Sequence, residues 1–103
     1  MQYKSTRNSS ISISSAEAIK KGLSEEGGLF VPETIPAVTA SEIEALASLD
    51  YRARAKAVLS KFLTDFTEAE IENCVNNAYT KEKFGSDNIA PVYKLAEGEY
   101  ILE

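Results

Sequence analysis

The sequence contains no histidine and no tryptophan, and it has a single cysteine, Cys74. Without histidine, a zinc site of the Cys/His kind is excluded, and the side chain that most often performs acid–base catalysis at neutral pH is missing. One cysteine cannot close an internal disulfide, which favours a reducing compartment. No apolar run approaches the roughly 20 residues of a membrane span or the core of a signal peptide. We therefore expect a cytoplasmic protein with no membrane partner.

Basic residues are in the minority, with 11 Lys and Arg against 16 Asp and Glu and a formal net charge of -5. The field of such a chain repels phosphate backbones, so nucleic acid is not an expected partner. The hydrophobic fraction of 44% and the charged fraction of 26% are those of an average soluble globular protein. At 103 residues the chain has the length of one ordinary domain, and we predict a single domain over residues 1–103.

Helix-capping residues predict the starts of about four helices. A side chain just before a helix can accept hydrogen bonds from the free backbone amides of its first turn. Three signals are capping boxes and one is a lone aspartate: Ser14 with Glu17, Thr39 with Glu42, Thr67 with Glu70, and Asp50. The first helix should cover about residues 15 to 21, because Gly22 offers a left-handed stop. Helices three and four should form an antiparallel pair with an apolar shared face made of Val58, Phe62, Ile71 and Val75.

Short apolar runs outside the helices predict strands. The run 29–31 lies between two glycines and a proline, and we expect it to plug into the core as a buried strand or anchored loop. The runs 92–95 and 100–102 flank a Glu-Gly pair and predict a hairpin. The predicted class is α+β, a mostly helical small domain with short strands at the N-terminus and C-terminus. Because the strand pattern is still running at Glu103, we expect the chain to continue in a longer polypeptide.

Catalytic and cofactor-binding groups are not apparent from the sequence. The acidic residues mostly occupy helix starts or exposed faces, where capping explains them, and we predict no catalytic residue and no metal site. Cys74 lies beside Val75 on an amphipathic helix and is predicted to be a packed or half-buried thiol. The lysines fall on helix faces, in turns or in a strand, so no cofactor-binding lysine is predicted.

One polar segment near the N-terminus is a candidate binding site. Ser5, Thr6 and Arg7 combine two hydroxyls with a guanidinium that can bind phosphate or carboxylate through two hydrogen bonds. The alternative is an ordinary surface loop or a structural salt bridge. The glycines of residues 22–28 have the spacing of a phosphate-binding loop, but the required lysine and hydroxyl residue are absent. A sharp turn after helix one is the favoured interpretation of those glycines.

Two stretches carry a family resemblance. Residues 3–7, Tyr-Lys-Ser-Thr-Arg, and residues 22–33, which include Gly-Gly-Leu-Phe-Val-Pro-Glu, resemble the opening of threonine synthases. Later landmarks that are similarly placed in that family extend the resemblance over nearly the whole chain: Leu49-Asp50-Tyr51, Ala78-Tyr79, Phe84 and Pro91-Val92. The family has glycine after Ser-Thr-Arg, whereas this chain has Asn8, the residue that best tolerates left-handed geometry after glycine.

The resemblance implies the N-terminal domain of a pyridoxal-phosphate-dependent lyase that converts O-phospho-L-homoserine and water into L-threonine and phosphate. It also implies that the catalytic lysine lies beyond the position of Glu103, so the chain alone should be inactive and should bind no cofactor. Its partners would be the catalytic domains of the same polypeptide, with Ser5, Thr6 and Arg7 as tentative substrate-binding residues. The alternative function is a free-standing acidic helical module that binds another protein.

Overall fold

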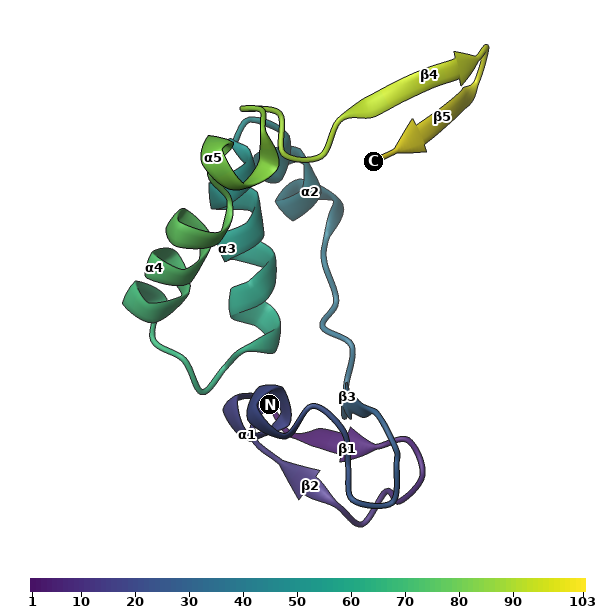
Figure 1. Cartoon of the computed structure of the whole chain (residues 1–103), viewed down its shortest axis with the longest axis vertical. Helices are drawn as coiled ribbons and strands as arrows, with labels where there is room; N and C mark the ends of the chain where they lie inside the picture. The colour runs from purple at the N-terminus through teal and green to yellow at the C-terminus, as the bar shows by residue number, and fades with distance from the viewer.

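A computed structural model describes all 103 residues, Met1–Glu103. The N-terminal part is a three-stranded antiparallel sheet with one helix, made of β1 (Tyr3–Ser5), β2 (Ser12–Ile13), α1 (Ser15–Lys21) and β3 (Phe30–Pro32). The strand order is β2-β1-β3, so the first strand is central and pairs with β3 over its full length. In Figure 1 this unit lies at the bottom of the molecule, below the helices.

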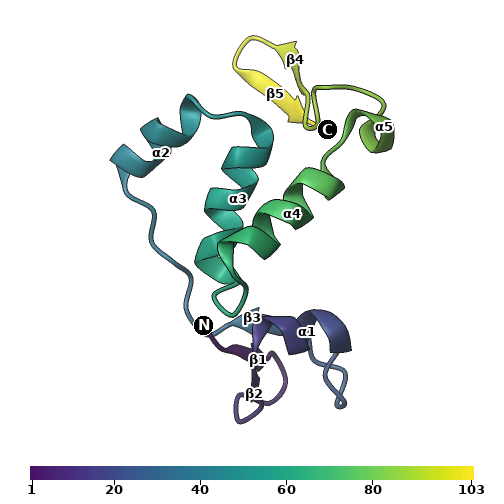
Figure 2. The ribbon, with the colours of Figure 1, turned by 90° about the vertical axis from the view of Figure 1, so that its left-hand side faces the viewer.

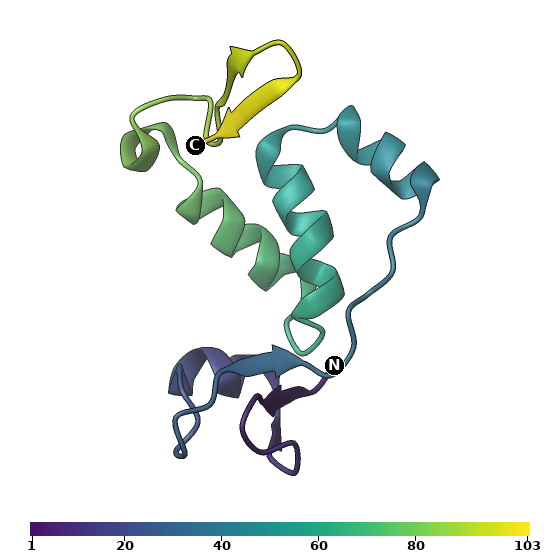
Figure 3. The same cartoon turned by 90° about the vertical axis from the view of Figure 1, so that its right-hand side faces the viewer.

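Four helices follow an extended segment, namely α2 (Ala40–Ala47), α3 (Tyr51–Phe62), α4 (Glu68–Ala78) and the short α5 (Lys81–Phe84). The three predicted capping boxes are present at α1, α2 and α4, and Asp50 caps α3. α3 and α4 pack together and run in opposite directions, as Figure 3 shows. Ile71 and Val75 of α4 are each only 3% exposed and are the most deeply buried large side chains.

The chain ends in a hairpin formed by β4 (Val92–Ala96) and β5 (Glu99–Leu102), with Gly98 at a φ of 78° in the turn. The hairpin projects away from the helices in Figures 1 and 3. The radius of gyration is 16.4 Å, whereas a compact domain of this length would have about 13 Å. The molecule is therefore more extended than an ordinary domain.

The loop between α3 and α4 ties the N-terminal sheet to the helices. The Tyr3 hydroxyl donates to the carbonyl of Phe62 at 3.1 Å, and the Met1 amino group donates to Thr64 Oγ1. Asp65 accepts from the Ala16 amide at 3.0 Å and from the Ser15 hydroxyl, so its carboxylate binds the start of α1 from 49 residues away. Figure 2 shows this loop lying directly above β3 and α1.

The predicted α+β class is confirmed, with helices in the middle and short strands at both ends. Several local predictions are wrong. Cys74 is exposed, although Ile71 and Val75 beside it on α4 are buried. The run 29–31 does not fill a core: Leu29 and Val31 are exposed at the rim of the sheet.

Two of the four side chains assigned to the α3–α4 interface face elsewhere. Val58 and Phe62 line a groove of about 500 Å³ between α3, α2 and the extended segment before α2. The groove lies between α3 and the α2 side of the molecule, so these two side chains border an open groove and are not buried against α4 as Ile71 and Val75 of α4 are against α3. The four-residue α5 and the two-residue β2 were not predicted, because neither is long enough to show a period.

Candidate functional site: the Ser5–Arg7 turn and the glycine loop

The predicted binding residues lie where β1 ends, opposite the loop that precedes β3. Ser5 pairs with Phe30 in the sheet register. Thr6 extends the pairing by one residue: its amide donates to the Leu29 carbonyl at 2.9 Å, and its Oγ1 accepts from the Leu29 amide at 3.0 Å. The hydroxyl of Thr6 therefore already has a structural partner within the chain.

Glu26 is the centre of the hydrogen bonds in this turn. Its carboxylate accepts from the hydroxyl of Ser24 at 2.5 Å and from the hydroxyl of Ser5, and both serines are buried. These two bonds, that of Ser24 first, hold the pKa of the Glu26 carboxyl below its usual value. Buried hydroxyls need partners, so Glu26 serves the loop even though its own side chain is exposed.

Arg7 is held by one contact and remains open to solvent. Its Nη1 donates to the backbone carbonyl of Glu26 at 2.8 Å, and its amide donates to Ser5 Oγ at 3.2 Å. No carboxylate lies within ion-pair distance of the guanidinium, and Nε and Nη2 make no hydrogen bond within the chain. Arg7 thus keeps donors that can bind an anion.

Gly27 and Gly28 allow the loop to approach this turn closely. Gly27 has a φ of 82°, in the left-handed region, and a Cβ at this position would lie 2.8 Å from Arg7 Nη1. A Cβ at Gly28 would overlap Ser5 Oγ and lie 3.1 Å from the Arg7 amide. Gly27 makes the sharp turn that the sequence predicted. Both glycines also leave the space that the side chains of Ser5 and Arg7 occupy.

The structure brings Ser5, Thr6 and Arg7 together and adds Ser24 and Glu26, which sequence reasoning missed. Only the β1–β3 pairing places Glu26 against Ser5, so no local pattern could have revealed the contact. Asn8 does not adopt left-handed geometry, since no residue other than glycine has a positive φ. Its Oδ1 instead accepts from the Ser10 amide at 3.1 Å and closes a small turn.

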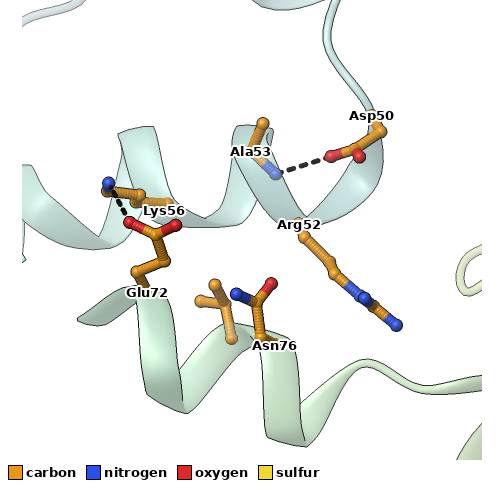
Figure 4. Close-up of a pocket in the computed structure, with 7 residues that line it drawn as sticks. Asp50, Arg52, Ala53, Lys56, Glu72 and Asn76 are labelled. Carbon is orange, nitrogen blue, oxygen red and sulfur yellow. Dashed lines mark hydrogen bonds and ion pairs between the residues drawn. The ribbon is translucent and has the colours of Figure 1, made fainter. Parts of the chain in front are cut away.

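A second polar cluster lies between α3 and α4, in a hollow of about 340 Å³ shown in Figure 4. Asp50 accepts from the Ala53 amide at 2.8 Å as a helix cap, and Lys56 Nζ lies 2.8 Å from Glu72 Oε2. The bond to Glu72 raises the pKa of Lys56. The side chains of this cluster cap and join the two helices, and none pairs a nucleophile with a base.

A lysine that binds an aldehyde cofactor must lose its proton to react, so the contacts of the lysines bear on that role. Lys56 is ion-paired and its pKa is raised. Lys61 lies 2.6 Å from Glu42, whose pKa is lowered to about 2 chiefly by that bond. Three other lysines also donate to oxygen acceptors: Lys81, Lys83 and Lys94. These five ammonium groups are therefore already bonded to oxygen acceptors within the chain.

The fold and the turn define a small α+β domain whose polar groups mainly maintain its own architecture. The sequence profile of the family described as "Threonine synthase N terminus" matches residues 2–79. The chain belongs to this family.

Full-length relatives show how much of a longer protein the chain represents. It is 34% identical to the threonine synthase of Corynebacterium glutamicum over 98% of its own length and 22% of that protein. It is 30% identical to the threonine synthase of Methylobacillus glycogenes over 99% of its length and 23% of that protein. A crystal structure of pyridoxal-phosphate-bound threonine synthase from Brucella melitensis superimposes with a TM-score of 0.82 at 32% identity, covering 100% of this chain and 22% of that one.

A last property of the helices is their suitability for crossing a membrane. None of them combines the length and the apolar character that crossing a bilayer requires.

Proposed function

We propose that this chain is the N-terminal domain of a cytoplasmic enzyme that converts O-phospho-L-homoserine and water into L-threonine and phosphate. The observation that carries the proposal is the end-to-end similarity, at 30–34% identity, to about a fifth of each full-length threonine synthase. The lyase chemistry, the catalytic lysine and the bound pyridoxal phosphate belong to catalytic domains of the same polypeptide. The chain alone is inactive, because the catalytic lysine lies in those domains.

We further propose that the Ser5–Arg7 turn binds the phosphate group of the substrate. Arg7 makes the contact through its free Nε and Nη2 donors, since a planar guanidinium matches two phosphate oxygens. Ser5 and Thr6 act by holding the turn, because their hydroxyls are bonded to Glu26 and to the Leu29 amide. The support is geometric: the guanidinium is fixed on one side and open on the other.

A chimera tests both statements. Residues 1–103 replace the matching stretch of the Corynebacterium glutamicum enzyme, and phosphate release from phosphohomoserine is measured. We expect activity, which the excised 103-residue chain lacks. A stable, cofactor-loaded chimera without activity would contradict the proposed function.

Arg7→Ala in the chimera should lower kcat/KM at least about tenfold, or about 1.4 kcal/mol, because a charged hydrogen bond to the substrate is lost. Arg7→Lys should restore part of the loss. Lys21→Ala removes one positive charge from an exposed position that borders the same hollow as Ser24 and Glu26, and it should leave kcat/KM unchanged. If Arg7→Ala melts at the parental temperature with unchanged kcat/KM, the turn has only a structural role.

The alternative of a free-standing acidic interaction module is not favoured. Relatives that match nearly the whole chain include threonine synthases in which the matched part is a minor share of a longer polypeptide.

A further inference from the structure

The C-terminal hairpin is apolar on both faces. Residues directly opposite one another in an antiparallel pair share a face. Tyr93 pairs with Ile101 on one face, and Val92 pairs with Leu102 on the other. All four side chains are exposed, from 45% for Ile101 to 70% for Leu102. A sheet that borders water normally alternates apolar and polar sides, whereas strands covered on both sides are apolar throughout.

Nothing in the rest of the chain covers the hairpin. β4 and β5 make their extensive contacts with each other, and every residue from Val92 to Glu103 is exposed. Each strand also has one free edge, because the sheet has only two strands. An isolated two-stranded hairpin is marginal in water, and exposed apolar edges invite pairing with further strands.

The family profile ends before the hairpin, whereas a solved relative matches through it. The N-terminal family profile ends at residue 79, before the hairpin begins. The Brucella melitensis threonine synthase nevertheless matches this chain over 100% of its length, hairpin included, while 78% of that larger chain lies outside the match. A large amount of polypeptide is therefore present in the relative to cover a hairpin of this kind.

We propose that β4 and β5 are the first strands of the neighbouring catalytic domain rather than part of the N-terminal domain. The occupant of the hairpin's two faces is then the polypeptide that makes up the remainder of a threonine synthase, with at least one free edge extended by its strands. The boundary between the domains lies between Phe84 and Val92, not after residue 103. The proposal rests on the proposed function for the identity of this occupant.

Hydrogen exchange in the isolated chain and in the chimera described above tests the proposal. In the isolated chain, the amides of residues 92–102 should exchange nearly as fast as those of an unfolded segment, while those of α3 and α4 are protected. In the chimera, protection of residues 92–102 should rise at least about 100-fold, to the level of a core strand. Equal protection in the two proteins would overturn the proposal.

Matched substitutions identify the covered faces. Ile101→Glu and Leu102→Glu each place a charge on one face, and Ile43→Glu is the control on α2, where the isoleucine is likewise exposed. In the chimera, both hairpin variants should lose the gained protection and melt at lower temperature than the control. If either hairpin variant behaves like Ile43→Glu, that face is not buried and the proposal fails.

The outcomes separate this inference from the proposed activity. A chimera that is inactive but protects residues 92–102 refutes the activity and supports the hairpin assignment. An active chimera with unprotected hairpin amides refutes the hairpin assignment and leaves the activity standing. Protection that appears only at high chimera concentration would assign the faces to a second copy of the chain and overturn the proposal.

Discussion

In residues 1–84, which we call the braced part, elements distant in sequence bind one another, whereas β4 and β5 bind mainly each other. Tyr3 reaches Phe62, and Asp65 reaches the start of α1. The hairpin is richer in apolar residues than the chain as a whole but makes no such ties. The difference shows that a strand-like sequence pattern indicates that a segment can form a strand. The pattern does not indicate whether the rest of the same chain covers that strand.

The largest expected difference between the two regions comes from removing the same side chain from each. Ile71→Ala in the braced part should lower the free energy of unfolding by about 2 to 4 kcal/mol, because Ile71 is buried and a cavity remains. Ile101→Ala in the hairpin should change it by less than about 0.5 kcal/mol. Urea denaturation of the isolated chain measures both. Equal losses would mean that the hairpin unfolds together with the braced part.

A glycine pair sharpens the same contrast. Gly28→Ala places a methyl group against Ser5 Oγ and should cost about 1 to 3 kcal/mol of stability through overpacking. Gly98→Ala strains the hairpin turn, where φ is positive and no other atom is near, but the melting of the braced part should not change. Circular dichroism at the helical minimum follows that melting, and a matching shift in the two variants would contradict independent regions.

A smaller loss of stability is expected at Asp65, because this residue caps α1 from the surface. Asp65→Ala should cost about 1 kcal/mol, the usual effect of losing a helix cap. Asp87→Ala is the control: this aspartate pairs with Lys81 at an exposed site, where a salt bridge contributes little. If the two variants melt at the same temperature, the brace between the α3–α4 loop and α1 does not stabilise the fold.

Acid should weaken the braced part gradually. Hydrogen bonds from Ser15 and from the Ala16 amide lower the pKa of Asp65, and bonds from Lys61 and Thr39 lower that of Glu42 to about 2. A carboxyl with a lowered folded pKa stabilises the fold above its unfolded pKa, and this contribution is lost as the pH falls through the folded value. The melting temperature should thus be steady near neutrality and fall between about pH 4.5 and pH 2. A flat profile across that range would refute these contacts.

The sequence was most informative where structure is decided locally. The boxes at Ser14, Thr39 and Thr67 predicted three helix starts, because donor and acceptor lie three residues apart. The second acceptor at α1, Asp65, could not be predicted, since it depends on a loop about 50 residues away. The same limit applies to the candidate site: Arg7 and the two glycines were visible, but Glu26 acquires its role only from the β1–β3 pairing.

The bonds from Tyr3 to Phe62 and from Asp65 to α1 also set an order of events during synthesis. The first strand and the first helix leave the ribosome well before their partners, which follow 59 and 49 residues later. At 5 to 20 residues per second, this delay is roughly 2 to 12 seconds. The nascent N-terminus must wait unbraced for that time, and the translation speed of the α2–α3 region therefore governs how long its apolar residues are exposed to chaperones and to other chains.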